Sequence, residues 1–190
     1  MRTTALLPLL AALLGACSLA PTAPARAVYD LGPAPAAAAA GGALAWRIAD
    51  VTAPTWLSGD GIAYRLNFQQ AQRLERYRDS VWAAPPPALL TQRLRQQLAA
   101  QPGCEGRPAA LLAVNLDEFE QQFGSATHSQ AVLRVHATLW PAGGGAALQQ
   151  HWRLERPAAP DAPGAARALA QAVDDWLPQL QAWLAASACR

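Results

Sequence analysis

The three cysteines are the side chains of this chain best suited to covalent chemistry. Cys17 ends an apolar N-terminal run, Cys104 lies in mid-chain, and Cys189 is the next-to-last residue. A thiol can form a disulfide, bind a metal, attack a substrate or carry a lipid, and its neighbours decide which. None of the three stands at the close spacing from another cysteine or a histidine that a zinc site requires. Their roles therefore depend on the segments around them.

The segment before Cys17 has the features of an export signal. Arg2 precedes an apolar run from Ala5 to Leu14, which is too short to cross a membrane that needs about 20 apolar residues. Two cleavage sites compete. Ala25-Arg26-Ala27 fits ordinary signal peptidase and would release a soluble exported protein. Leu14-Gly15-Ala16-Cys17 resembles a bacterial lipobox with its two small residues in the less usual order. We favour the lipobox because it directly follows the apolar run.

This interpretation divides the chain into residues 1–16 as a lipoprotein signal peptide, 17–27 as the lipidated Cys17 with a tether, and 28–190 as the domain. Cys17 would carry diacylglycerol and an N-acyl chain, and two or more chains give stable anchoring. Aspartate after the cysteine is the best-known signal for inner-membrane retention, so Ser18 predicts the periplasmic face of the outer membrane of a Gram-negative bacterium. No other cofactor is predicted.

Cys104 and Cys189 are the pair that remains for a disulfide in an oxidising compartment. The bond would close a loop of about 85 residues and contribute about 2–5 kcal/mol. The alternative is two free thiols, which holds if the Cα atoms lie more than about 7 Å apart.

The remaining polar residues do not form a recognisable catalytic or metal site. No histidine stands at metal-ligand spacing, so we expect strand histidines that are hydrogen-bonded or solvated. Glu118 and Glu120 share a face if their strand continues, and we favour a solvated edge over paired acid catalysis. The chain has no nucleophile elbow, phosphate loop or zinc-protease motif. We therefore predict no enzyme, with neither catalytic nor metal-binding residues. The histidines are His128, His136 and His151.

The charge pattern argues against nucleic acid as a partner. All 15 basic residues are arginines, the formal net charge is only +2, and the arginines are not clustered. Proteins that bind nucleic acid need a basic patch or stripe to neutralise phosphates.

Apolar periodicity predicts strands in seven segments and two long helices. Pro86-Pro87 should begin the first helix, with Leu90, Leu94 and Leu98 on one side and Arg93, Arg95 and Gln96 on the polar side, and Pro102-Gly103 should end it. The second helix, about 164–186, has an apolar stripe that predicts core packing, and Pro178 should kink it. The segments that contain the strands are 28–33, 43–54, 62–68, 73–87, 110–123, 130–140 and 147–156. The stripe is Leu169, Val173, Trp176, Leu177, Leu180, Trp183 and Leu184.

This order of elements predicts an α/β fold with α+β character. We expect a single mixed, largely antiparallel sheet covered by the two long helices.

Four segments in order resemble the ABC-type transport auxiliary lipoprotein family. They read YDLGP, VTAPTWLSGDGIAYRL, RYRDSVWAAPPPALLTQRLRQQL and LAVNLDEFEQQFG. Family members commonly have arginine before the tryptophan of the third segment, but this chain has Val81, so no role for that arginine is carried over. The residues that fall on the family pattern are Pro54, Leu57, Tyr64, Arg65, Tyr77, Ser80, Trp82, Ala83 and Pro85.

The resemblance implies a non-enzymatic docking component of an MCE-type ABC transport system that moves lipids or other hydrophobic molecules across the periplasm. Its partners would be an MCE-domain periplasmic protein with its inner-membrane complex, and the outer membrane through the lipid. Because some relatives form rings, the resemblance also implies that this chain could assemble into a homo-oligomeric ring. The alternative is a periplasmic lipid-binding carrier with a cavity between sheet and helices. Tyr77 and Trp82 are candidate interface aromatics, although we favour the core for Trp82.

Overall fold

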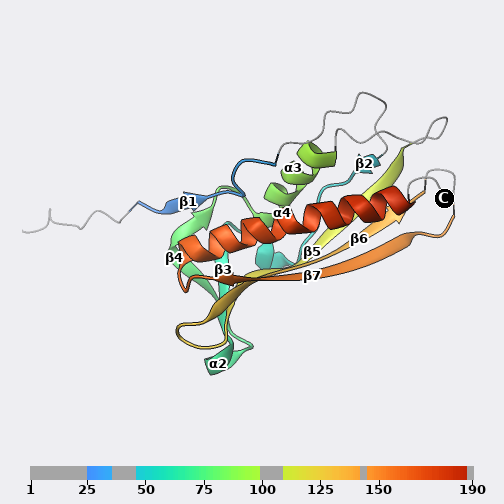
Figure 1. The fold of residues 1–190 in the computed structure, drawn as a ribbon. Helices are drawn as coiled ribbons and strands as arrows, with labels where there is room; N and C mark the ends of the chain where they lie inside the picture. Colours follow the sequence, from blue (N-terminus) through green and yellow to red (C-terminus); the bar gives the residue numbers. More distant parts are fainter. Residues whose placement is uncertain (1–24, 36–45, 99–108, 142–144, 188–190) are drawn as a thin grey trace, which may run out of the picture.

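The computed structural model describes residues 25–35, 46–98, 109–141 and 145–187. These residues form a seven-stranded mixed sheet with a long C-terminal helix packed against it (Figure 1). The strands are β1 (Ala27–Tyr29), β2 (Trp46–Ile48), β3 (Gly61–Leu66), β4 (Leu74–Trp82), β5 (Ala110–Phe123), β6 (Ser129–Trp140) and β7 (Leu148–Ala158). The helices are η2 (Thr55–Leu57), α2 (Asn67–Gln70), α3 (Pro86–Leu98) and α4 (Ala162–Ser187).

The strand order β1-β4-β3-β5-β6-β7 confirms the predicted mixed α/β fold. The β5–β6 and β6–β7 pairs are antiparallel, as expected for consecutive hairpins, and so is the β3–β4 pair. β2 and β3 both pair in parallel with β5, β2 at residues 110–112 and β3 at residues 120–123. β1 pairs in parallel with β4 and forms one edge of the sheet.

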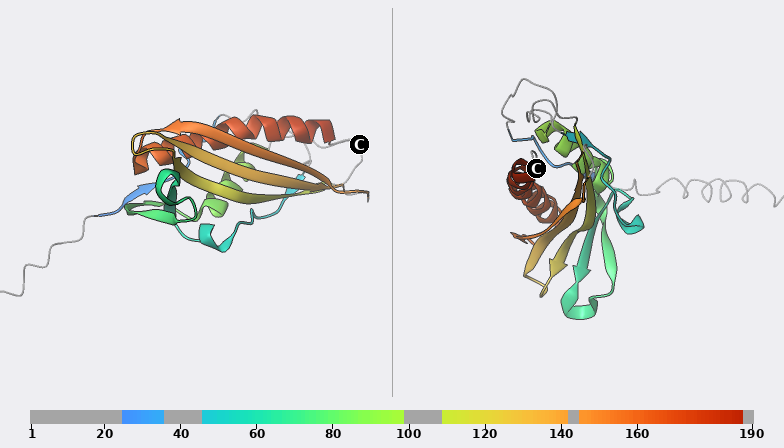
Figure 2. Two further views of the ribbon diagram at one scale, coloured as in Figure 1. Left: turned by 90° about the horizontal axis from the view of Figure 1, so that it is seen from below. Right: turned by 90° about the vertical axis from the view of Figure 1, so that its right-hand side faces the viewer.

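The core lies between the sheet and the helices. Alternating residues of β5, such as Leu112, Val114 and Leu116, are buried on the side of the sheet that α4 covers. The apolar stripe of α4 packs against them as predicted, and the Trp152 and Trp176 rings meet edge to face with centroids 6.0 Å apart. Figure 2 shows α4 along one side of the sheet. α4 remains one helix through Pro178.

Two strands are shorter than the periodicity predicted. β2 has only three residues, and after Ile48 the chain keeps a single bridge to β5 at Thr52 before Pro54 leads into η2. β3 ends at Leu66, and Phe68 lies exposed in α2 instead of continuing the strand. β3 ends where its neighbour does, since Leu66 pairs with Phe123, the last residue of β5. β2 leaves its regular pairing earlier, although β5 continues far beyond the residues that pair with β2. The predicted end of the first long helix at 102–103 lies outside the described residues.

Among the described residues, no helix is both long enough and apolar enough to cross a membrane.

Candidate functional site at the N-terminal strand

The predicted lipid anchor Cys17 and the predicted disulfide pair Cys104 and Cys189 lie outside the described residues. Both remain predictions. The nearest described part of the chain to the anchor is β1, so β1 and its surroundings are where attachment to a membrane would meet the folded domain.

Trp82 belongs to the core and is not an exposed interface residue. Its side chain is 1% exposed, and its ring centroid lies 5.4 Å from that of Phe119. Its burial among core residues does not fit an interface role, and Trp82 lies in β4 at the residue that pairs with Tyr29 of β1. The preferred alternative, the core, is what the structure shows.

Tyr77 is half-buried, and a hydrogen bond from its hydroxyl group fixes the position of the side chain. The phenol donates a hydrogen bond of 2.6 Å to Oε1 of Gln121, and its ring centroid lies 4.7 Å from that of Tyr64. Burial raises the pKa of Tyr77, which keeps the phenol protonated. A role for Tyr77 at an interface remains a prediction.

The histidines are hydrogen-bonded or solvated as expected: His151 is exposed, whereas His136 is hydrogen-bonded at both ring nitrogens. Its Nδ1 lies 2.9 Å from Asp117 Oδ2, its Nε2 lies 2.8 Å from Asn115 Nδ2, and its ring stacks on His151. Across the described ranges, no three histidine, cysteine or acidic side chains are grouped as a metal site would need.

The two glutamates of β5 form ion pairs with arginines. Glu118 is 3.1 Å from Arg134 and 3.0 Å from Arg153. Glu120 is only 1% exposed and lies 2.7 Å from Nε of Arg65. The expectation of a solvated edge is wrong for Glu120, because β3 pairs with β5 at this residue and covers it. Each glutamate thus has at least one arginine partner.

β1 is fixed to the sheet by its backbone. Ala27, Val28 and Tyr29 are in register with residues 80–82 of β4, and the N–H of Ala83 donates 2.6 Å to the carbonyl of Tyr29. The chain then turns at Gly32, whose φ of 68° is in the left-handed region that favours glycine. The Asp30 carboxylate accepts a 2.7 Å bond from the Gly32 N–H and stabilises this turn.

Arg93 of α3 binds the chain directly after β1. Its Nη2 donates to the carbonyls of Leu31 at 2.6 Å and Gly32 at 2.7 Å, and its Nη1 lies 3.0 Å from Asp174 Oδ1 on α4. The Arg93 side chain is 3% exposed. One buried guanidinium thus joins three parts of the fold. We call this group, Arg93 with Asp174 and the carbonyls of residues 31–32, the Arg93 clamp.

Burial raises the pKa of Asp174, and the positive charge of Arg93 opposes that rise. One turn further along α3, Gln97 donates 2.6 Å to the carbonyl of Pro35 and extends the attachment. α3 therefore supplies side-chain donors to carbonyls of the segment after β1, including that of the buried Leu31.

Sequence reasoning placed Arg93 on the polar side of its helix, and this prediction is wrong. The period-four leucines define only part of the buried surface of α3. Leu89, one turn before Arg93, is also buried, and this wider stripe brings Arg93 to the edge of the core. A second signal was the proline-rich segment 31–35, whose carbonyls have no strand or helix of their own to supply donors.

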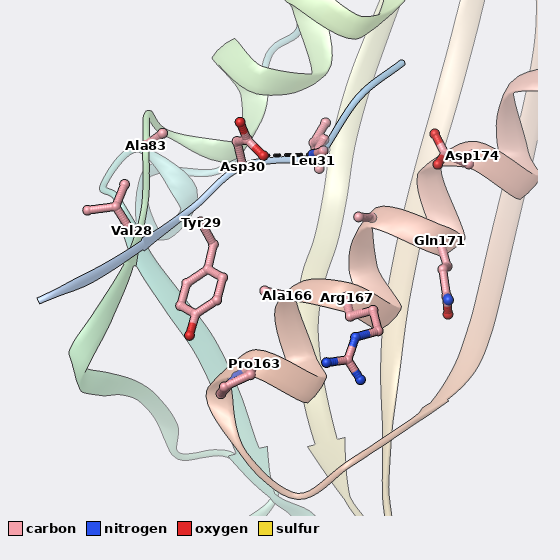
Figure 3. Close-up of a pocket in the computed structure, with 12 residues that line it drawn as sticks. Val28, Tyr29, Asp30, Leu31, Ala83, Pro163, Ala166, Arg167, Gln171 and Asp174 are labelled. Carbon is pink, nitrogen blue, oxygen red and sulfur yellow. Dashed lines mark hydrogen bonds between the residues drawn. The ribbon is translucent and has the colours of Figure 1, made fainter. Parts of the chain in front are cut away.

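A hollow of about 490 Å³ lies between β1 and the first half of α4 (Figure 3). The α4 wall is made of small residues, including Ala166 and Ala170, with Arg167 and Gln171 at the rim. On the β1 side, Val28 is 63% exposed. The lining has no nucleophile paired with a base, so the chemistry it supports is binding.

Comparison with known proteins adds family information to this geometry. Residues 29–180 match a family model described as the ABC-type transport auxiliary lipoprotein component. Comparison with curated protein sequences gives no match.

Two solved structures share the fold. One is protein XCC0632 from Xanthomonas campestris, assigned to the family model DUF330, with a TM-score of 0.63 and 17% identity over 84% of this chain and 85% of that one. The other is described as an uncharacterized protein, with a TM-score of 0.62 and 18% identity over 84% of this chain and 99% of that one.

Proposed function

Because this chain belongs to the ABC-type transport auxiliary lipoprotein family, we propose that it is a non-enzymatic docking component, held at the outer membrane by lipid on Cys17. In this proposal it receives the far end of an MCE-domain protein whose other end joins an inner-membrane complex. The system would move lipids or other hydrophobic molecules across the periplasm.

The Arg93 clamp is the observation that carries the proposal beyond the family match. A docking protein on a lipid anchor must transmit the position of the anchor to its binding surface. The tether from Cys17 to β1 has about 10 residues and reaches about 35 Å at most. The clamp joins the segment directly after β1 to both long helices, so the part of the domain where the tether enters is held to the rest of the fold.

The alternative, a lipid-binding carrier, has less support. A carrier needs an apolar cavity between sheet and helices. In the described structure that space is filled by residues such as Trp152, Trp176 and Leu180. The hollows of 410–660 Å³ lie instead beside α3 and β1, with charged residues in their walls.

The decisive experiment compares the wild-type chain with Cys17→Ala in cell envelopes. We expect the wild type in the outer-membrane fraction and cross-linked to an MCE-domain protein. Cys17→Ala should have the same circular dichroism spectrum but appear in the soluble periplasmic fraction. Cys104→Ala is the matched control, because it removes a cysteine without touching the lipobox and should stay in the membrane.

Two results would contradict the proposal separately. If intact envelopes yield no MCE-domain protein with the wild type, the docking role is wrong. If Cys17→Ala stays in the outer-membrane fraction without any bound partner, the lipid anchor is wrong.

A further inference from the structure

We propose that the free edge of β1, together with the hollow between β1 and α4, binds an extended peptide segment as an added strand, with an acidic peptide side chain at Arg167. The proposal rests on the proposed function in naming the transport partner as the source of that segment. The residues around the hollow indicate the chemistry of that segment: an extended backbone with one carboxylate side chain.

The outer edge of β1 presents backbone groups for pairing. The carbonyl of Tyr29 accepts from Ala83 on the β4 side. In a parallel pair, alternate residues direct both backbone groups to the same neighbour, so the N–H and C=O of Val28 face away from β4. Among the described residues, no other strand follows β1 in the sheet order. Within that part of the chain, an incoming strand at this edge would find one unused donor and one unused acceptor at Val28.

The opposite edge of the sheet is protected in a way that β1 is not. Sheet edges are commonly blocked by charges and proline, and β7 carries Arg153, Glu155, Arg156 and Pro157. Its Arg156 also pairs with Asp175 of α4 at 2.6 Å. β1 consists of Ala27, Val28 and Tyr29 and has none of these features. Only its shortness limits pairing, so a partner needs additional contacts beyond the backbone.

The hollow supplies those contacts. Ala166 and Ala170 leave room on α4 for a side chain that projects from an added strand. Arg167 takes part in none of the ion pairs found in the described structure, and Figure 3 shows its guanidinium extending from α4. A carboxylate is the side chain that an unpaired guanidinium binds best, through two parallel hydrogen bonds.

The same lining argues against an anionic membrane surface as the occupant. Asp30 and Asp174 also line the hollow, so its lining as a whole is of mixed charge and not positive. The headgroup layer of a bilayer would also offer no backbone N–H and C=O groups to pair with those of Val28 in a β-ladder. An extended peptide satisfies both features, as in other proteins that add a strand to a sheet edge.

The test uses the full-length lipoprotein in detergent and a fluorescent peptide, acetyl-Ser-Thr-Val-Glu-Val-Thr-Ser-amide, with fluorescence anisotropy as the readout. Val28→Pro removes the outward N–H but leaves the Tyr29 carbonyl bonded to Ala83, and it should weaken binding about tenfold. Val28→Thr keeps the backbone donor and is the matched control, expected to bind within about threefold of wild type.

Arg167→Gln should weaken binding about fivefold, and the peptide with Gln in place of Glu should lose the same factor with the wild type but nothing more with Arg167→Gln. The same variants are then compared for cross-linking to the MCE-domain protein in envelopes. Loss of cross-linking in Val28→Pro but not in Val28→Thr would support this edge as the docking strand.

Two outcomes would overturn the inference. Equal peptide binding by wild type and Val28→Pro would show that no strand is added at β1. Absence of peptide binding, with Arg167-dependent binding to phosphatidylglycerol vesicles, would identify a membrane contact instead. Peptide binding in vitro without any MCE-domain protein in envelopes would leave strand addition standing and contradict only the proposed function.

Discussion

The side of the sheet under α4 and the side turned away from it carry opposite kinds of residue on the same strands. In one cross-strand row, Leu116, Val135 and Trp152 lie buried toward α4. In the next row, Glu118, Arg134 and Arg153 form ion pairs that remain partly exposed. The covered side is held by close packing, whereas the open side is held by pairs that water and salt screen. The same strands should therefore tolerate substitution very differently on their two sides.

The largest effect should come from removing a core tryptophan. Trp176 is fully buried against Trp152, so Trp176→Ala should lower the free energy of unfolding by about 3–5 kcal/mol through lost burial and a cavity. Urea denaturation followed by far-UV circular dichroism measures this. The control is His151→Ala on the open side, where we expect a change of no more than about 1 kcal/mol. Equal losses in the two variants would contradict the comparison.

A slightly smaller loss of stability should distinguish Arg93 from Arg95, two arginines on the same helix. Arg93→Met leaves Asp174 and two carbonyls without their donor and should cost about 2–4 kcal/mol. Arg95→Met is the matched control, because Arg95 makes only an exposed pair with Asp50, worth less than about 1 kcal/mol.

Hydrogen exchange at residues 27–32 gives a second readout for this pair. Arg93→Met should speed exchange there, while Arg95→Met should not. A slow, wild-type exchange rate in Arg93→Met would show that the clamp does not hold β1.

Asp174 should make a modest contribution to the pH dependence of stability. Its pKa is raised in the folded state, mainly by burial, so the native protein holds this proton more tightly than the unfolded chain does. This contribution to stability is therefore complete at low pH, below the unfolded pKa, and is lost as the pH rises through the folded pKa.

Unfolding free energies of wild type and Asp174→Asn across acidic pH isolate this contribution, because asparagine does not titrate. Removing Arg93 removes the charge that lowers this pKa, so Arg93→Met should move the loss to higher pH. A parallel pH dependence in wild type and Asp174→Asn would contradict the prediction.

The smallest effect should come from the open side. Glu118→Gln removes the partner of Arg134 and Arg153, and we expect a loss below about 1 kcal/mol that shrinks further in 1 M salt. Thermal or urea unfolding at low and high salt checks it. A loss of stability as large as that of Trp176→Ala, and unchanged by salt, would show that water and salt do not screen these ion pairs. That result would contradict the comparison of the two sides.

The elements that sequence predicts best are those whose pattern repeats over many residues. β5, β6 and β7 were found from strict alternation, and the stripe of α4 from its period of three and four. Each of these patterns reports a face that is buried along its whole length, so local sequence and tertiary packing agree.

Two of the predictions that failed concern residues whose surroundings come from distant parts of the chain. Arg93 is buried by residues 31–33, about 60 positions earlier, and Glu120 is covered by β3 through Arg65. For Trp82 the sequence leaves both the core and an interface open, with the core favoured, and its contact with Phe119 of β5 shows the core. The apolar spacing within one segment carries no information about neighbours that lie far away in the sequence.

The sequence by itself determined the family, the order of strands and helices, and the stripe that α4 buries, because repeated apolar spacing specifies which side of an element avoids water. Only the tertiary structure decided that Arg93 joins β1 to both long helices and that Val28 is left at a free edge beside Arg167. Those placements depend on which segments meet in space, since a hydrogen bond or ion pair forms wherever its two partners are brought within about 3 Å.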